Sequence, residues 1–238
     1  IIPGDVSWAL SLEEATRLLD VVDQDTDSPS RGRDYAILTL FLNCGMRVSE
    51  LAGISREDID AELRSLRVVG KGAKERIIYL NDACKAALTA YLPIRNATPT
   101  KKRLENALFI SRNGNRMSVR MIQTVVYKYL DASGLGNKHY SAHKLRHTAA
   151  TLMYQSGEVD IRVLKDILGH EQLNTTQIYT HVSNAHMEEA MSKNPLAKAS
   201  RLRKAKPMQA LSAEDAENET DERDLGGLRT GIRQTEGS

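Results

Sequence analysis

Residues 142–155 read Ala-His-Lys-Leu-Arg-His-Thr-Ala-Ala-Thr-Leu-Met-Tyr-Gln, and this stretch predicts a helix that ends before Gly157. Residues three apart lie on the same face of a helix, so we expect His143 and Arg146 side by side. A hydrophobic core rarely holds such basic side chains unless they are paired. The stretch therefore predicts a structural element and marks a candidate site.

Outward from this helix, most of the chain carries helical signals. Ser11 and Glu14 form a capping box that starts a helix through Val22, and a polar loop follows over residues 23–30. Further helices are expected over about residues 34–43 with a stop at Gly45, from Asn81 to Leu92 before Pro93, from Ser118 to Leu130, and over about 160–168, 174–181 and 184–193.

Residues 63–80 have the pattern of a β-hairpin. Two short strands, residues 66–69 and 76–79, flank the turn Gly70-Lys-Gly-Ala-Lys74. A further short strand is expected at residues 107–110, before an Asn113-Gly114 turn. The expected fold class is mostly α with a small antiparallel β-sheet (α+β).

Charge is distributed unevenly along the 238 residues, although the net charge is only +2. Residues 1–30 hold one basic and seven acidic side chains, residues 31–206 hold 29 basic and 16 acidic, and residues 207–238 hold three basic and eight acidic. The middle is therefore a basic body, and residues 95–120 alone contain seven basic side chains against one acid. This distribution favours a polyanion as partner, although a solvated charged face explains many such runs.

Several features limit the class of protein. No apolar run approaches the roughly 18 residues of a membrane span, so no membrane partner is expected. Cys44 and Cys84 lack metal-ligand spacing and are interpreted as two buried thiols in a reducing cytosol. Residues 200–238 are polar and acidic, which is typical of a disordered tail.

Four places hold side chains that suit chemistry better than packing. They are Arg47 after the Gly45 helix stop, Lys71 in the hairpin turn, the pair His143 and Arg146, and His170 with Tyr179 nine residues later. Their surroundings resemble the tyrosine recombinase family, also called the phage integrase family, and within it the Xer-like bacterial branch. The matching segments are Gly-Met-Arg-Val-Ser-Glu-Leu, Gly-Lys-Gly-Ala-Lys-Glu-Arg, His-Lys-Leu-Arg-His, Leu-Gly-His and Thr-Thr-Gln-Ile-Tyr. The resemblance covers about residues 8–195 and includes all six catalytic positions of the family: Arg47, Lys71, His143, Arg146, His170 and Tyr179.

The resemblance implies a catalytic domain at residues 1–199 that cleaves and rejoins double-stranded DNA at specific sites. It implies a 3′-phosphotyrosyl link to Tyr179, no cofactor, no metal and no ATP, and a location in the bacterial cytoplasm at the nucleoid. Members usually carry a separate N-terminal helical domain, for which there is no room before Ser11, so we expect the catalytic domain alone. The resemblance also implies a homo-tetramer on two DNA sites, in which the apolar stripe of helix 184–193 docks on a neighbouring subunit.

These residue types fit the implied transesterification. A tyrosine is only about 0.1% ionised at pH 7, so Tyr179 needs a base and a positive site beside it. Arg47 and Arg146 can neutralise the charge that builds on the phosphate oxygens, and Lys71 can protonate the leaving 5′-oxygen. His143 is expected as base or as support for Arg146, and His170 as a donor to the phosphate.

Other interpretations of the same residues exist. Arg47 could form a structural ion pair with Glu50, which we expect to orient it, and Lys71 could be an ordinary turn lysine. His143 and His147 could bind zinc, but Lys144 stands where the metalloprotease pattern needs Glu. At the level of function, a type IB topoisomerase or a DNA-binding protein without catalysis are the alternatives.

Overall fold

The computed structural model describes residues 9–100, 106–138, 140–156, 159, 163–164, 168 and 184–197, and the structural statements below concern these residues. For Lys71, Asn184 and Ala185 it describes the backbone alone. All described residues belong to one unit, residues 1–206.

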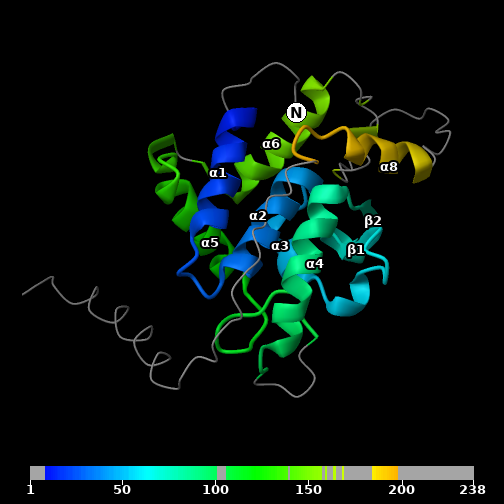
Figure 1. Cartoon of the computed structure of the whole chain (residues 1–238). Helices are drawn as coiled ribbons and strands as arrows, with labels where there is room; N and C mark the ends of the chain where they lie inside the picture. The colour runs from blue at the N-terminus through cyan, green and yellow to red at the C-terminus, as the bar shows by residue number, and fades with distance from the viewer. Residues whose placement is uncertain are drawn as a thin grey trace, which may run out of the picture. The chain divides into compact units, whose positions relative to one another are not determined.

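The fold is built around helix α2, Arg31–Cys44, which is buried on nearly all sides. A helix that is apolar all round belongs inside a fold rather than on its surface. α2 contacts four helices: α1 (Leu12–Gln24), α4 (Asp82–Ala97), α5 (Val119–Ala132) and α6 (Ala142–Gln155). Figure 1 shows this arrangement, with α2 between the other helices.

Local capping signals set most helix boundaries as expected. The Ser11–Glu14 capping box is present at the start of α1, and the side chains of Asn81 and Ser118 cap α4 and α5. Gly45 ends α2 in the left-handed conformation with φ 59°. The left-handed backbone favours glycine there, and a Cβ at Gly45 would also lie 2.8 Å from Leu168 Cδ2, so that side chain would have to shift.

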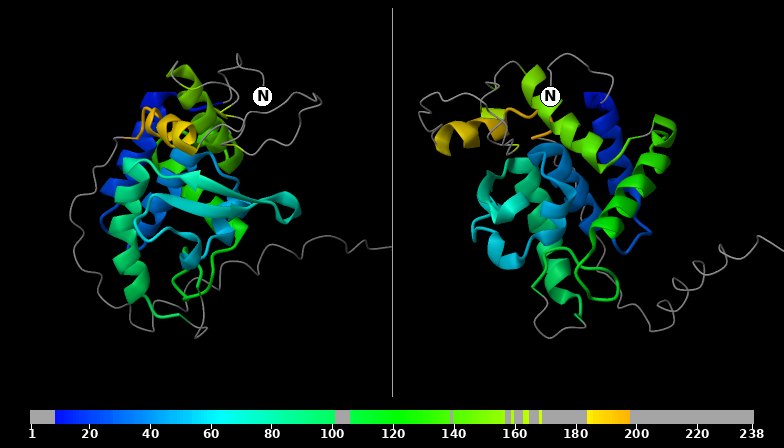
Figure 2. Two further views of the ribbon diagram at one scale, coloured as in Figure 1. Left: turned by 90° about the vertical axis from the view of Figure 1, so that its right-hand side faces the viewer. Right: turned by 180° about the vertical axis from the view of Figure 1, so that it is seen from behind.

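The hairpin is also confirmed. Strands β1 (Ser65–Val69) and β2 (Glu75–Tyr79) pair antiparallel, with Leu66 opposite Ile78, and form a two-stranded sheet. A single 3₁₀ turn at Lys71–Ala73 joins them. The short helix α3, Val48–Gly53, packs against β1, and the hairpin turn projects beyond the helices (Figure 2). Two more 3₁₀ turns lie at Arg56–Asp58 and Gly136–Lys138.

The helix expected to stop before Pro93 instead continues to Ala97. Pro93 lacks the N–H that would bond one turn back, but contacts from outside the helix fix its flanks. The Tyr91 hydroxyl donates to the Leu108 carbonyl at 3.0 Å, and Arg95 Nε donates to the Ala107 carbonyl at 2.8 Å. Tertiary anchoring therefore overrides the local helix stop.

The prediction of a strand at residues 107–110 was wrong. Its backbone forms only isolated bridges, Ser55 with Ala107 and Ile110 with Arg116. The segment is buried, but its chain bends at Leu108 and Phe109 and its two ends pair with different loops, so no ladder forms. The α2 prediction was three residues short, since the helix begins at Arg31.

Near the C-terminal end, α8 (Asn184–Ser192) was expected to present a free apolar stripe. Two members of that stripe, Ala190 and Met191, are instead buried in the chain's own core. Asn81 Nδ2 donates to the Met191 carbonyl at 3.2 Å, and Asn194 Nδ2 donates to the Leu42 carbonyl at 3.0 Å. Within the helix expected at 160–168, only residues 163, 164 and 168 are described, and the helix at 174–181 lies outside the description. No helix in the described ranges is long and apolar enough to cross a membrane.

Candidate active site

Arg47 occupies the junction between α2 and α3, where the N-terminus of α3 holds it. Its backbone N–H donates to Glu50 Oε2 at 2.7 Å, and its Nη1 donates to Glu50 Oε1 at 2.8 Å. The side chain of Glu50 is 1% exposed, whereas that of Arg47 is 36% exposed. The expected contact is therefore present, and it leaves a buried anion beneath a partly exposed cation.

Arg76 of β2 binds the same carboxylate, and the sequence interpretation assigned it no role. Its Nη1 and Nη2 donate to Glu50 Oε1 and Oε2 at 2.6 and 2.9 Å. This fork-to-carboxylate geometry is the strong, directional form of the ion pair. A signal existed in the alternation of the strand, because Arg76 lies on the same face as buried Ile78 and pairs with buried Val68. A charge on the inward face of a strand requires a partner.

Arg146 of α6 completes the group. It is buried, and its Nη1 and Nη2 donate to the carbonyls of Gly45 at 2.7 Å and Leu168 at 2.6 Å. Burial, followed by the charge of Arg47, lowers the pKa of Arg146 to about 10, while Glu50 acts in the opposite direction. Arg146 therefore remains protonated at pH 7.

We call Arg47, Arg76, Arg146 and Glu50 the arginine cluster. Burial alone would raise the pKa of the Glu50 carboxyl, but hydrogen bonds from Arg76 and Arg47 lower it below its usual value. Glu50 is therefore ionised at pH 7, and its single negative charge against three arginines leaves the cluster with a net charge of +2. Such a cluster can bind an anion with planar or tetrahedral oxygens, such as a phosphodiester.

The Nε atom of Arg76 is an unsatisfied hydrogen-bond donor in this arrangement. It is buried and has no hydrogen-bond partner within the described part of the chain. An unsatisfied buried donor costs about 1–3 kcal/mol. The cluster therefore holds more positive charge and donor capacity than its own acceptors use.

Lys71 lies on the turn that this cluster anchors. The Gly70 N–H donates to the Lys74 carbonyl at 2.8 Å, which closes the turn. A Cβ built on Gly70 would lie 3.4 Å from Glu50 Oε1 and 3.7 Å from Arg76 Nη1. The residue preceding Lys71 thus borders the cluster, which agrees with the prediction that Lys71 serves the same site.

His143 lies one turn before His147 on α6, and the two rings contact each other. Their Nε2 atoms are 2.8 Å apart, and the rings meet edge to face at 86°. Burial, then the charges of His143 and Arg146, lower the pKa of His147, so its ring is neutral at pH 7. From the sequence, His143 and His147 were paired only as possible zinc ligands, and a direct contact between the two rings was not predicted.

The structure thus brings together Arg47 and Arg146, with the Lys71 turn beside them. His170 and Tyr179 lie outside the described residues, so their roles stay predictions. The carbonyl of Leu168, two residues before His170 in the sequence, accepts a hydrogen bond from Arg146 Nη2, so Leu168 lies at the cluster.

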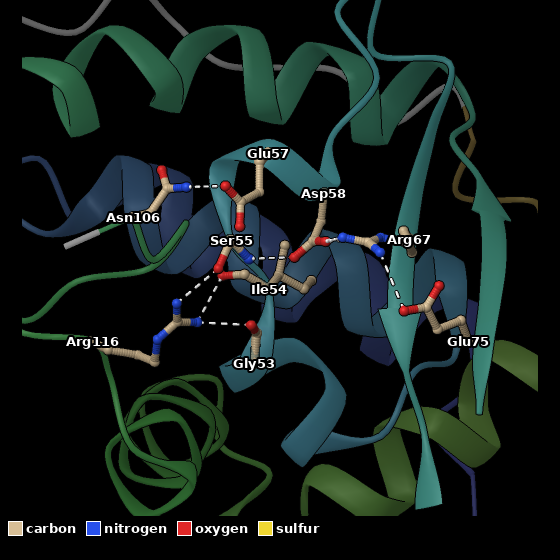
Figure 3. A network of polar contacts seen from close by, with 9 residues as sticks. All are labelled: Gly53, Ile54, Ser55, Glu57, Asp58, Arg67, Glu75, Asn106 and Arg116. Atoms are coloured by element: carbon tan, nitrogen blue, oxygen red, sulfur yellow. Dashed lines mark hydrogen bonds and ion pairs between the residues drawn. The ribbon is translucent and has the colours of Figure 1, made fainter. Parts of the chain in front are cut away.

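Two arginines of the basic run at residues 95–120 bond to the chain itself. Arg95 is buried, and Arg116 closes the C-terminal end of α3 (Figure 3). Arg116 donates to the carbonyls of Ala52, Gly53 and Ile54 at 3.2, 2.7 and 3.0 Å and to Ser55 Oγ at 2.8 Å. Two of the seven basic residues therefore support the fold itself.

A second polar group in Figure 3 ties the hairpin to the turn after α3. Arg67 of β1 contacts Asp58 at 2.7 Å and Glu75 of β2 at 3.2 Å, while Asn106 donates to Glu57 at 2.7 Å. Elsewhere in the described ranges, no group of three or more His, Cys, Asp or Glu side chains is placed to hold a metal ion.

Comparison with known proteins gives a consistent result. The model of the phage integrase family matches residues 9–186. "Tyrosine recombinase XerC" of Caldanaerobacter subterraneus subsp. tengcongensis is 52% identical over 188 residues, which cover 79% of this chain and 51% of that protein.

Two solved structures are similar as well. The crystal structure of XerA recombinase has 32% identity and a TM-score of 0.60, and the match covers 76% of this chain and 63% of that one. XerH site-specific recombinase, bound to its difH substrate in a pre-cleavage complex, has 29% identity and a TM-score of 0.60, over 77% of this chain and 53% of that one. The fold class expected from the sequence is thereby confirmed. The chain spans between half and two thirds of the length of these relatives.

Proposed function

Because this chain belongs to the phage integrase family, we propose that it is the catalytic portion of a site-specific tyrosine recombinase. It cleaves and rejoins strands of double-stranded DNA through a 3′-phosphotyrosyl bond to Tyr179. The observation that supports this most is the arginine cluster, in which Arg47 and Arg76 bind the buried carboxylate of Glu50 and Arg146 adds a buried cation. Residues 1–199 are the catalytic domain in this proposal, and residues 200–238 are an acidic tail.

The arginine cluster binds the scissile phosphate. Arg47 and Arg146 neutralise the negative charge that grows on the non-bridging oxygens as phosphorus becomes five-coordinate. Glu50 and Arg76 orient Arg47 and add charge from the hairpin side. Because these charges are fixed before DNA binds, little reorganisation is needed in the transition state.

The proposed step exchanges one phosphate ester for another. The Tyr179 oxygen forms a bond to phosphorus, the bond from phosphorus to the 5′-oxygen breaks, and His143 helps to remove the tyrosine proton. Lys71 gives a proton to the leaving 5′-oxygen, and His170 donates a hydrogen bond to the phosphate. The ester energy is retained in the phosphotyrosyl bond, so the reverse reaction rejoins DNA without ATP. The arginines supply the counter-charge, so the step needs no metal.

The partners follow from the same proposal. DNA is the substrate, and the similar XerH site-specific recombinase has been solved bound to its difH substrate. A tetramer on two DNA sites requires α8 to contact a neighbouring protomer. Because Ala190 and Met191 are packed in the chain's own core, α8 would have to leave this position first. The names of the relatives favour recombination over topoisomerase activity and over DNA binding without catalysis.

A nicked suicide substrate tests the proposal directly. The protein should form a DNA adduct that survives denaturation, in the presence of excess EDTA, and Tyr179→Phe should form none. Tyr154, an exposed tyrosine of α6, provides the matched control, because Tyr154→Phe should keep the adduct yield. An adduct of equal yield in Tyr179→Phe, or cleavage that requires magnesium, would refute the proposed mechanism.

A further inference from the structure

The solvent side of α6 carries an imidazole pair that the proposed cleavage chemistry uses only in part. His143 is exposed and His147 is half-buried, so the pair is accessible from solution. Their Nε2 atoms are 2.8 Å apart, and one ring must donate to the other. The cleavage step needs one imidazole, which leaves the purpose of the second open.

The separation of the two nitrogens also fits a shared metal ion. Nitrogens that lie about 2.0–2.1 Å from one ion are about 2.9 Å apart at an angle of 90° and about 3.3 Å apart at the tetrahedral angle. The observed 2.8 Å is close to the first value, which belongs to square-planar and octahedral sites. Histidines four apart on a helix thus already have the spacing of two adjacent ligands.

We propose that His143 and His147 form a two-ligand site for a late first-row divalent ion, of the Ni²⁺, Cu²⁺ or Zn²⁺ class, and that this ion inhibits strand cleavage by occupying His143. The inhibition rests on the proposed function, whereas the binding does not. When the ion binds, the donating ring moves its Nε2 proton to Nδ1 through solvent, and no net proton is released.

The ligand type and the neighbouring side chains determine which ions the pair can bind. Neutral imidazole selects late transition metals over Mg²⁺ and Ca²⁺, which require oxygen ligands. Within the described ranges no third His, Cys, Asp or Glu joins the pair, so the proposed site has two protein ligands, and we expect water at its other positions and an exchangeable ion. The charge of Arg146 opposes binding, but it also helps to keep His147 in its neutral, ligating form.

The site differs from the zinc-peptidase pattern considered for the same residues. A catalytic zinc would need Glu beside the first histidine to act as base, and Lys144 is there instead. The proposed ion activates no water. It competes with the tyrosine proton for the imidazole of His143.

Ni²⁺ titration of the tag-free protein by calorimetry tests the binding. Wild type should bind Ni²⁺ and not Mg²⁺, and His143→Gln and His147→Gln should each weaken the Ni²⁺ affinity by about tenfold or more. His186→Gln, which removes an exposed histidine of α8, should bind as wild type does. Since His143 is exposed, its variant tests the site even if His147→Gln fails to fold. Ni²⁺ affinity unchanged in His143→Gln would overturn the proposal.

Adduct formation on the suicide substrate tests the inhibition. Ni²⁺ should suppress wild-type cleavage, EDTA should restore it, and His147→Gln should need about tenfold more Ni²⁺ for the same fractional inhibition. Equal inhibition of both proteins would overturn the inhibitory role. A protein that binds Ni²⁺ through the pair but forms no adduct without metal would instead contradict the proposed function and leave the metal site standing.

Discussion

Arginines hold both ends of α3, and the difference between the two ends separates binding chemistry from structural support. At the N-terminal end, Arg47 and Arg76 surround Glu50 and leave excess positive charge. At the C-terminal end, Arg116 donates to three successive backbone carbonyls and one hydroxyl. The first arrangement concentrates charge that an anion can complement, whereas the second satisfies the carbonyls that a helix end leaves unpaired.

The comparison teaches that the contacts of a guanidinium matter more than its charge. Residues 95–120 contain seven basic side chains and one acid, yet Arg95 and Arg116 within them bond to the chain's own carbonyls. The arginines of the proposed phosphate site instead come from the start of α3, from β2 and from α6. If the two ends of α3 differ in this way, substitutions at the N-terminal end should mainly slow cleavage, and substitutions at the C-terminal end should mainly lower stability.

The largest expected effect lies at the hairpin turn, which Arg76 ties to the N-terminal end of α3. Lys71→Ala should slow cleavage by about two to four orders of magnitude, the usual worth of a general acid. A thiolate leaves without help, because a thiol has a pKa of about 8.5. DNA with sulfur at the 5′-bridging position should therefore restore the Lys71→Ala rate nearly to that of wild type.

Two matched variants sharpen this test. Lys74→Ala removes the other lysine of the turn and should neither lose the rate nor respond to sulfur. Arg76→Gln should lose about a hundredfold, since it loosens the turn that carries Lys71, and sulfur should rescue part of that loss. If sulfur rescues Lys74→Ala but not Lys71→Ala, the acid has been assigned to the wrong residue.

The second prediction sets the two ends of α3 directly against each other. Arg47→Ala should reduce cleavage by about 10²–10³-fold, because a preorganised donor to the phosphate is lost. Arg116→Ala should instead lower the stability by about 2 kcal/mol, or about 4–8 °C in Tm, through the loss of charged hydrogen bonds. The cleavage rate of each variant is measured under single-turnover conditions at a temperature below both Tm values. Thermal unfolding gives the Tm of each variant. Equal losses of cleavage would remove the distinction between the two ends.

The third prediction concerns the carboxylate beneath the cluster. The pKa of Glu50 is lowered in the fold, so its contribution to stability is present above the unfolded pKa of about 4.3 and is lost as the pH falls through the folded value. Glu50→Gln should cost about 1–3 kcal/mol at pH 7 and flatten the acid limb of the stability profile. Chemical denaturation from pH 3 to 7 measures both effects. An acid limb unchanged in the variant would mean that other carboxylates dominate it.

Much of the fold was predictable because its signals are local. The capping box at Ser11, the glycine stop at Gly45 and the Gly-rich hairpin turn each involve residues a few positions apart. The sequence did not predict the structure where contacts between distant residues determine it. Pro93 lies inside a helix because Tyr91 and Arg95 are anchored to another segment.

The residues of the site also divide into those with a local sequence signal and those identified only by distant contacts. Its candidate residues came from short motifs and from resemblance to a family, and Arg47 with Glu50 lies within one turn. Arg76 was missed because its partner is 26 residues away. Arg116 was grouped with a basic surface because its acceptors are mostly backbone carbonyls, which every residue carries and no sequence marks.

The smallest expected effect is on DNA affinity, and it separates the two ends of α3 without any catalysis. A protein that neutralises phosphates releases counterions, so the logarithm of its affinity falls linearly with the logarithm of salt concentration, by about 0.9 per phosphate contact. Arg47→Ala should lower that slope by about one contact, because Arg47 faces the phosphate in the proposed site. Arg116→Ala should leave the slope unchanged, since its guanidinium is engaged by the end of α3. Fluorescence anisotropy with a labelled duplex at several salt concentrations provides both slopes. A lower slope for Arg116→Ala would mean that the C-terminal end of α3 also contacts DNA, and that its arginine combines support with binding.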